Sequence, residues 1–408
     1  MNPPLIKPFR GLRPAPGQAT AVAAPPYDVL STSEARERAV GRPWSFLHIS
    51  KPEIDLPPDT DPYAPEVYAK AAENLQKMLA AGVLERDEAP CYYAYRLIMG
   101  SHVQTGLVAA ASVAAYDANR IKKHEFTRPD KEDDRVRQIE AVNAQTGPVL
   151  LAYPSSATAD SLLALASAGE PAADVTAADG IRHTIWVVRD RELIAKISAA
   201  FSALPALYIA DGHHRSAAAS RVCATRHAAG ASAYFLAVIF PHHQMRIMDY
   251  NRVVKDLNGL SEVEFLQRVG TSFSVTPAEA QFSPGRPGEF ALYLPGRWLR
   301  LVIRPELIPG HDPVARLDVS LLTQHLLAPV LGIVDLRRDK RIDFVGGIRG
   351  LSELEKRVDS GEMAAAFALH ATRMEDLMAV ADAGEVMPPK STWFEPKLAD
   401  GLVSHVLD

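Results

Sequence analysis

Cysteine is nearly absent from the 408-residue chain, which contains only Cys91 and Cys223. Two cysteines provide neither a disulfide framework nor a thiolate set for a metal, so we interpret both as small buried hydrophobic residues. The sequence also lacks an apolar run of about 18 residues or more, and its first residues lack the apolar region of a secretion signal. We therefore predict a soluble, cytoplasmic protein that makes no membrane contact.

A surplus of basic charge is absent as well. The chain has 44 Lys and Arg against 49 Asp and Glu, which gives a formal net charge of -5 at pH 7. Proteins normally neutralise a nucleic-acid backbone with a basic surface, so we expect no nucleic-acid partner. GxGxxG, HExxH and paired CxxC motifs are missing too. In GEVMPPKS, Pro389 replaces the second glycine of a phosphate loop and removes one of its N–H donors, so we expect no P-loop.

The rest of the composition is typical of a globular protein, with 47% hydrophobic and 23% charged residues. A chain of this length exceeds the size at which one hydrophobic core usually keeps growing, so we predict two lobes, residues 1–255 and 256–408. Helical and strand patterns alternate, which indicates a mixed α/β (α+β) fold. The clearest patterns are a helix over residues 64–83, a strand pair around Gly100-Ser101 and a strand in ALYIA.

The stretch YIADGHHRSAAA predicts a strand that ends where a helix begins. Asp211 or Gly212 caps the helix, whose first N–H groups are unpaired and carry a partial positive charge. Arg215 adds a fork that suits phosphate, and His213 or His214 can donate hydrogen bonds or transfer a proton. We therefore predict a phosphate site here. Adjacent histidines project in different directions, so we predict no metal site, and a simple capped helix remains the alternative.

A charge-dense loop, IKKHEFTRPDKEDDR, offers the base that the first motif lacks. Glu125, desolvated beside cations, would accept a proton from a substrate hydroxyl. Arg128, Lys131 and Arg135 would neutralise phosphate. The alternative is a solvated face held by weak ion pairs.

A third polar segment, MPPKSTWFEPK, lies near the C-terminus and is stiffened by its prolines. Lys390, Ser391 and Thr392 form a compact set of donors for a substrate carboxylate or phosphate. In this interpretation the segment closes over a ligand, whereas in the alternative it packs on the surface as a terminal arm.

Seven short motifs occur in order along the chain: PFRGLRP, PPYDV, WSFLHI, HEFT with a following DR, DGHHR, YNRVV and MPPKSTWFEPK. Together they resemble a bacterial domain-of-unknown-function family, the one numbered ten-fifteen. That family resembles a distant branch of the ParB/sulfiredoxin-like superfamily, which includes kinases of free L-serine. The resemblance implies a nucleotide-binding core of that fold with large insertions, followed by a C-terminal α+β lobe.

The resemblance also implies a function in serine metabolism. A phosphoryl group would pass from ATP or ADP, with Mg²⁺, to the hydroxyl of a small metabolite, with free L-serine and O-phosphoserine as the best guess. Glu125 would be the base, Asp211 would orient the hydroxyl or hold Mg²⁺, and His213 would be catalytic. The resemblance implies phosphate binding by Gly212, His214, Arg215, Arg128, Lys131 and Arg135, and substrate binding by Lys390, Ser391, Thr392, Asn251 and Arg252.

The chain departs from the compact kinases in two ways. Lys123 stands where their first box has proline, and 86 positions separate Glu125 from Asp211, which implies an insertion between them. Two other functions use the same residues. One is a regulatory module that binds a nucleotide or phosphometabolite without chemistry, and the other is a metal-dependent hydrolase that uses the pairs His213-His214 and His242-His243. The sequence leaves a homodimer open.

Overall fold

The computed structural model describes residues 4–408 and divides the chain into two compact units. The first unit runs to Met245 and takes in Pro396–Asp408, and the second is Arg246–Glu395. The mixed α/β class predicted from the sequence is confirmed. The boundary lies earlier than residue 255 because strand β14 (Tyr250–Val254) pairs with strands of the second unit. Within residues 4–408, no helix is both long and apolar enough to cross a bilayer.

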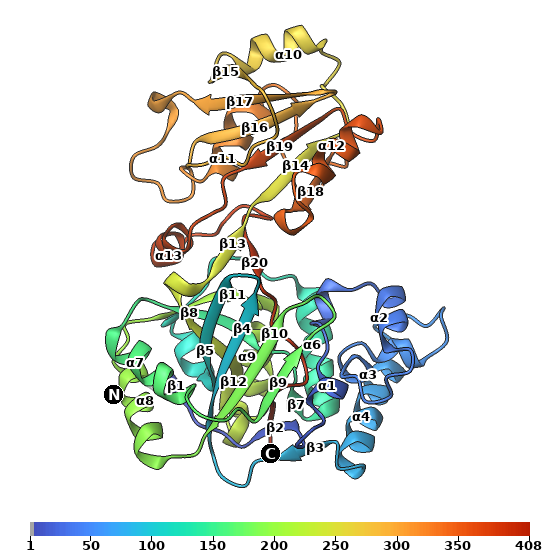
Figure 1. Ribbon diagram of the computed structural model, residues 1–408, viewed down its shortest axis with the longest axis vertical. Helices are drawn as coiled ribbons and strands as arrows, with labels where there is room; N and C mark the ends of the chain where they lie inside the picture. Colours follow the sequence, from blue (N-terminus) through green and yellow to red (C-terminus); the bar gives the residue numbers. More distant parts are fainter. Residues whose placement is uncertain (1–3) are drawn as a thin grey trace. The chain divides into compact units, whose positions relative to one another are not determined.

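The first unit is built on a nine-stranded mixed sheet (Figure 1). Its strand order is β6-β11-β8-β12-β5-β4-β10-β9, and β1 pairs with β5. The predicted strand pair is the antiparallel hairpin of β4 and β5, which turns at Gly100-Ser101. The strands are β1 (Ile6–Lys7), β4 (Tyr92–Met99), β5 (His102–Ser112), β6 (Ile121–Lys122), β8 (Val149–Tyr153), β9 (Ala173–Thr176), β10 (Arg182–Val188), β11 (Leu207–Asp211) and β12 (Tyr234–Pro241).

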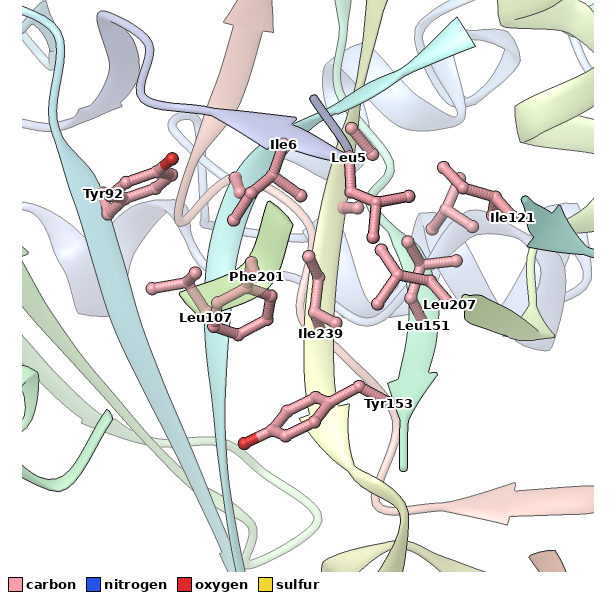
Figure 2. Packing of buried hydrophobic residues seen from close by; sticks show 14 of the residues in the cluster. Leu5, Ile6, Tyr92, Leu107, Ile121, Leu151, Tyr153, Phe201, Leu207 and Ile239 are labelled. Atoms are coloured by element: carbon pink, nitrogen blue, oxygen red, sulfur yellow. The ribbon is translucent and has the colours of Figure 1, made fainter. Parts of the chain in front are cut away.

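The core of this unit lies on the central strands, which are apolar along most of their length. In β12 every residue after the first is buried, and β8 is buried throughout, as expected of strands covered on both faces. Figure 2 shows Leu107 and Ile239, from neighbouring strands, beside Phe201 of helix α8 (Arg191–Ser202), with Leu151 and Leu207 on the other side of Ile239. This packing holds the ends of β11 and β8 in fixed positions.

Helices surround the sheet and position the charged loop. Helix α6 (Pro129–Val142) packs against both α9 (His213–Thr225) and α4 (Pro65–Ala80), so the HEFT loop that precedes α6 lies beside the start of α9. The remaining helices of the unit are α1 (Ala19–Val22), α2 (Thr32–Ala39), α3 (Leu47–Ser50), α5 (Val113–Asp117) and α7 (Ala157–Ala166).

The chain end returns to the first unit through a small antiparallel sheet of order β3-β2-β21-β7. An isolated bridge between Ala24 and Asp400 adds to this pairing. Gly401 has φ +87°, and a Cβ there would lie 2.7 Å from Phe46, so only glycine fits this close approach. These contacts fix the positions of Lys397 and Asp400. The strands are β2 (Gly11–Pro14), β3 (Leu84–Arg86), β7 (Ala144–Gln145) and β21 (Ser404–Val406).

The second unit has a six-stranded sheet of order β15-β17-β16-β19-β14-β18 and a two-stranded ribbon, β13-β20. Its own core includes Val253, Ala291 and Leu354. A π-helical turn, Thr323–Leu327, follows helix α11. The elements not yet named are β13 (Arg246–Met248), β15 (Phe273–Ala278), β16 (Glu289–Leu294), β17 (Arg297–Ile303), β18 (Ile342–Gly346), β19 (Ala365–Leu369), β20 (Trp393–Glu395), α10 (Glu262–Val269), α11 (Asp318–Leu322), α12 (Ser352–Asp359) and α13 (Met374–Asp382).

Candidate functional site

The DGHHR motif forms the junction between β11 and α9. Asp211 ends the strand, Gly212 stands at the N-cap position with φ +98°, and His213 begins the helix. A Cβ at Gly212 would lie 3.0 Å from Nε of Arg215, so the tight turn and the neighbouring guanidinium both favour glycine. The strand end and helix start predicted from the sequence are therefore present. A helix start of this kind can bind an anion through its first-turn N–H groups, and phosphate binding there stays a prediction.

The HEFT loop brings two side chains to His213. Nδ1 of His213 lies 3.7 Å from Oε2 of Glu125, and the backbone N–H of His124 donates to Nε2 of His213 over 3.4 Å. The imidazole rings of His124 and His213 are 4.5 Å apart, edge to face. Because Nε2 of His213 accepts a hydrogen bond, the proton of the neutral ring sits on Nδ1, which faces Glu125. We call these three residues the His–Glu cluster.

The two histidines of the His–Glu cluster are neutral at physiological pH. Burial lowers the pKa of His124 to about 4 and holds the pKa of His213 well below its ordinary value. The side chain of Glu125 is 53% exposed. The cluster therefore presents one solvent-accessible carboxylate against two uncharged rings, which suits Glu125 for hydrogen bonding to a substrate hydroxyl.

Asp211 faces two cations. Its Oδ2 lies 3.3 Å from Nζ of Lys397, and its Oδ1 lies 3.6 Å from Nη2 of Arg215. Burial alone would raise the pKa of Asp211, but Lys397 and Arg215 outweigh it and hold that pKa below its ordinary value. The charge of Asp211 also acts on His124 and His213. Asp211 and Glu125, which are 86 positions apart, thus both lie near His213.

A second group of charged side chains, the arginine cluster, consists of Tyr27, Asp28, Arg135, Arg215 and Asp400. Arg215 donates to the carbonyl of Pro148 over 2.7 Å, and its Nη2 lies 3.7 Å from Oδ2 of Asp28. The guanidinium of Arg135 stacks 4.0 Å above the ring of Tyr27. Tyr27, Arg135, Arg215 and Asp400 line a cavity of about 30 Å³, which is room for one water molecule. Arg135, Arg215 and Asp400 are therefore a largely buried support beneath the start of α9, and Asp28 lies at its solvent-exposed side.

Asp400 is the member of the arginine cluster whose buried carboxylate lacks hydrogen-bond donors among the described residues. It is 1% exposed, and neither carboxylate oxygen has a hydrogen-bond partner among the described residues. Burial raises the pKa of Asp400 to about 7, although Arg215 opposes the shift. A carboxyl group with a raised pKa stabilises the folded protein most at low pH, and this contribution is lost as the pH rises through the folded pKa.

Replacing Asp400 with asparagine should therefore change the pH dependence of stability. Asparagine stays neutral, so the variant should gain stability relative to the wild type between about pH 4 and pH 7, by at most ~4 kcal/mol at about 1.4 kcal/mol per pKa unit. Urea unfolding of both proteins at about pH 5 and about pH 8 measures the difference. A difference that does not grow with pH would mean that Asp400 is ionised throughout.

Two of the predicted phosphate-binding side chains are directed elsewhere. The backbone N–H of Arg128 donates to Nε2 of His214 over 3.1 Å, but its exposed guanidinium pairs with Asp130. Nζ of Lys131 donates to the hydroxyl of Tyr63 over 2.7 Å. Arg128 thus orients His214 through its backbone, and phosphate binding by the side chains of Arg128 and Lys131 stays a prediction.

The five predicted substrate-binding residues belong to the second unit. Oδ1 of Asn251 accepts from the backbone N–H of Leu369, and fully buried Arg252 donates to the carbonyl of Lys390. Oγ of Ser391 donates to the carbonyl of Pro388. These contacts stabilise the second unit itself, and substrate binding by Lys390, Ser391, Thr392, Asn251 and Arg252 stays a prediction.

Sequence reasoning assigned no role to Lys397, Asp400, Tyr27 or Asp28. PPYDV and the FEPK segment were visible as motifs, yet nothing in their spacing places them beside DGHHR. His124 directly precedes Glu125 in KKHE, and this adjacency is a sequence signal that the two side chains could act at one site.

Fold and site together define a mixed α/β protein in which the His–Glu cluster lies at the start of α9. The chain belongs to the family described as protein of unknown function (DUF1015), whose model matches residues 6–320. This confirms the family predicted from the seven motifs. No curated protein matches the chain.

Solved structures with a similar arrangement include a free serine kinase in complex with AMP, at 16% identity and a TM-score of 0.37, covering 72% of this chain and 92% of that one. A conserved hypothetical protein from Pyrococcus furiosus has 16% identity and a TM-score of 0.34, covering 72% and 95%. SbnI with a C-terminal truncation, from Staphylococcus aureus, has 12% identity and a TM-score of 0.37, covering 72% and 85%.

Proposed function

We propose that the first unit transfers a phosphoryl group from ATP or ADP to the hydroxyl of a small metabolite, with free L-serine as the first acceptor to test. The observation that supports this most is the position of Glu125, a solvent-accessible carboxylate 3.7 Å from His213 at the first turn of α9. A phosphate at that helix start would lie next to the group that receives the proton. Phosphoryl transfer depends mainly on such positioning and on charge neutralisation.

The nucleotide phosphates would bind at the start of α9. The N–H groups of the first turn supply donors, and the helix dipole adds a partial positive charge. Nε2 of His214 accepts from Arg128, so neutral His214 carries its proton on Nδ1 and has a donor for a phosphate oxygen. Arg215 lies beneath this turn, and its side chain is only 11% exposed. It would therefore add positive charge to the site without binding the phosphate directly through its guanidinium.

In the proposed reaction, Glu125 accepts the proton of the acceptor hydroxyl while the hydroxyl oxygen attacks the terminal phosphorus. A new O–P bond forms, the bond to the bridging phosphate oxygen breaks, and ADP or AMP leaves with the electron pair. The proton on Nδ1 of His213 orients the carboxylate of Glu125. Asp211 is held by Lys397 and Arg215, which suits it to orienting these groups better than to binding a cation. Mg²⁺ that arrives with the nucleotide would neutralise phosphate oxygens.

The proposal is tested by incubating the full chain with Mg²⁺ and either ATP or ADP, with L-serine, other hydroxy amino acids and polyols in parallel. We expect an O-phosphorylated product in one of these reactions by mass spectrometry, and none with L-alanine, which lacks the hydroxyl. Nucleotide binding without product across both nucleotides and all acceptors would contradict the proposal and favour a regulatory binding module.

A further inference from the structure

The His–Glu cluster has the composition and the closeness of a metal site. One ligand atom from each of His124, Glu125 and His213 lies within 4.8 Å of the other two. His124 and His213 are 2% and 4% exposed, whereas Glu125 is solvent-accessible. Two rigid buried ligands and one open side would leave coordination positions for water or substrate, as in catalytic metal sites.

His124 supplies an independent reason to expect a ligand. Its Nδ1 is buried and has no hydrogen-bond partner among the described residues. A buried nitrogen without a partner carries a desolvation penalty, which a metal ion bound to its lone pair would remove.

The geometry points to a site for a divalent first-row transition ion, such as Zn²⁺ or Co²⁺, held by Nδ1 of His124, one nitrogen of His213 and the carboxylate of Glu125. Binding to His213 requires either that Nε2 gives up the 3.4 Å hydrogen bond from the His124 N–H or that Nδ1 loses its proton. Imidazole ligands favour these ions over Mg²⁺, which prefers oxygen ligands alone. Ligands about 2.1 Å from zinc lie roughly 3–3.5 Å apart, so ligand atoms that are now up to 4.8 Å apart must approach by about 1.8 Å at most. A rotation of the exposed Glu125 side chain can supply the movement of its carboxylate.

This metal site differs from the histidine pairs that the sequence suggested. His214 is held by the backbone of Arg128, and His213 binds together with His124 instead. His242 and His243 both approach Ser155, with their rings 5.8 Å apart. Only the combination of the HEFT loop with the start of α9 brings two imidazoles and a carboxylate together within the described part of the chain.

Metal binding has a consequence for the proposed phosphoryl transfer, and this consequence rests on that proposal. The carboxylate of Glu125 cannot ligate a transition ion and accept a proton with the same lone pairs. We therefore expect Zn²⁺ to inhibit the transfer in the presence of excess Mg²⁺. Binding itself does not depend on any activity.

The test uses metal-stripped full-length protein without nucleotide. Titration with Zn²⁺ by calorimetry, and with Co²⁺ by visible absorption, should show a single bound ion per chain with the intense bands of a site of low coordination number. Glu125→Gln and His124→Ala should each weaken binding by at least ~10–100-fold, the loss that even supporting residues of metal sites cause. His243→Ala is the matched control and should bind as the wild type does.

Two outcomes would overturn the metal site: no Zn²⁺ or Co²⁺ binding by the wild type, or binding that both cluster variants retain. Circular dichroism establishes that His124→Ala is folded, and Glu125→Gln keeps the test valid if it is not, because Glu125 is exposed. Metal binding with no phosphorylated product under any condition would leave the metal site standing and count against the phosphoryl transfer alone.

Discussion

Replacing Glu125 with glutamine is expected to lower the turnover of the nucleotide-dependent transfer by ~10²–10⁴-fold, the usual contribution of a general base. Glutamine keeps the size of the side chain and its place 3.7 Å from Nδ1 of His213, but its amide cannot accept the proton of the acceptor hydroxyl. The measurement is the rate of product formation by mass spectrometry at saturating nucleotide and acceptor, on metal-stripped protein with only Mg²⁺ added.

The same variant should keep its affinity for the nucleotide, because we assign the phosphates to the start of α9 and not to the carboxylate. Calorimetric titration with ADP tests this separately from turnover. Glu140→Gln, an equivalent change at an exposed position of α6, is the matched control and should leave both quantities unchanged. Unchanged turnover in Glu125→Gln would remove Glu125 from its role. A loss of turnover that matches a loss of nucleotide affinity would make Glu125 a binding residue.

The parts of the fold that the sequence predicted are those with local signals. The helix predicted over residues 64–83 is α4. The two apolar runs around Gly100-Ser101 form a hairpin, and its strands are long enough for their apolar residues to be recognised in the sequence. The junction of β11 with α9 was predictable because Asp211 and Gly212 separate an apolar run from a small-residue helix. Each of these features depends on residues close together in the chain.

The return of the chain end to the first unit had no such signal. It depends on β21 (Ser404–Val406), a strand of three residues that pairs with β2 near the other end of the chain. Three residues are too few for a recognisable period. The lobe boundary was misplaced for a related reason, since the apolar strand β14 fits either unit by composition and only its partners β18 and β19 decide.

The site shows the same division between local and distant information. The sequence identified Glu125, Asp211 and His213 from residue type, and the fold adds that Glu125 and Asp211 lie near His213. The direction of a long surface side chain depends on its neighbours, which is why Arg128 and Lys131 point to Asp130 and Tyr63. Lys397 and Asp400 enter the site only through tertiary structure.

Replacing Arg215 with alanine is expected to destabilise the first unit by ~1–3 kcal/mol, the cost of leaving a buried hydrogen-bond acceptor without its donor. The guanidinium of Arg215 lies near the carboxylates of Asp28 and Asp211. It donates a hydrogen bond to the carbonyl of Pro148, and its positive charge lowers the pKa of Asp400. Alanine would leave the buried Asp400 carboxyl and the buried carbonyl of Pro148 without their cation, whereas Asp28 and Asp211 are 40% and 36% exposed and can be solvated. Urea unfolding, followed by circular dichroism, measures the change in the free energy of unfolding.

The matched control for this prediction is Arg221→Ala, on the same helix. Arg221 forms exposed ion pairs with Glu132 and Asp133, and such pairs contribute about 0–1 kcal/mol.

The loss of folding stability in Arg215→Ala should also grow with pH. Arg215 lowers the pKa of Asp400, so without it the folded pKa of Asp400 rises further and its ionisation costs more stability in alkaline solution. Equal, small losses in both variants would mean that Arg215 is solvated, and the arginine cluster would then not be the buried support of the α9 start.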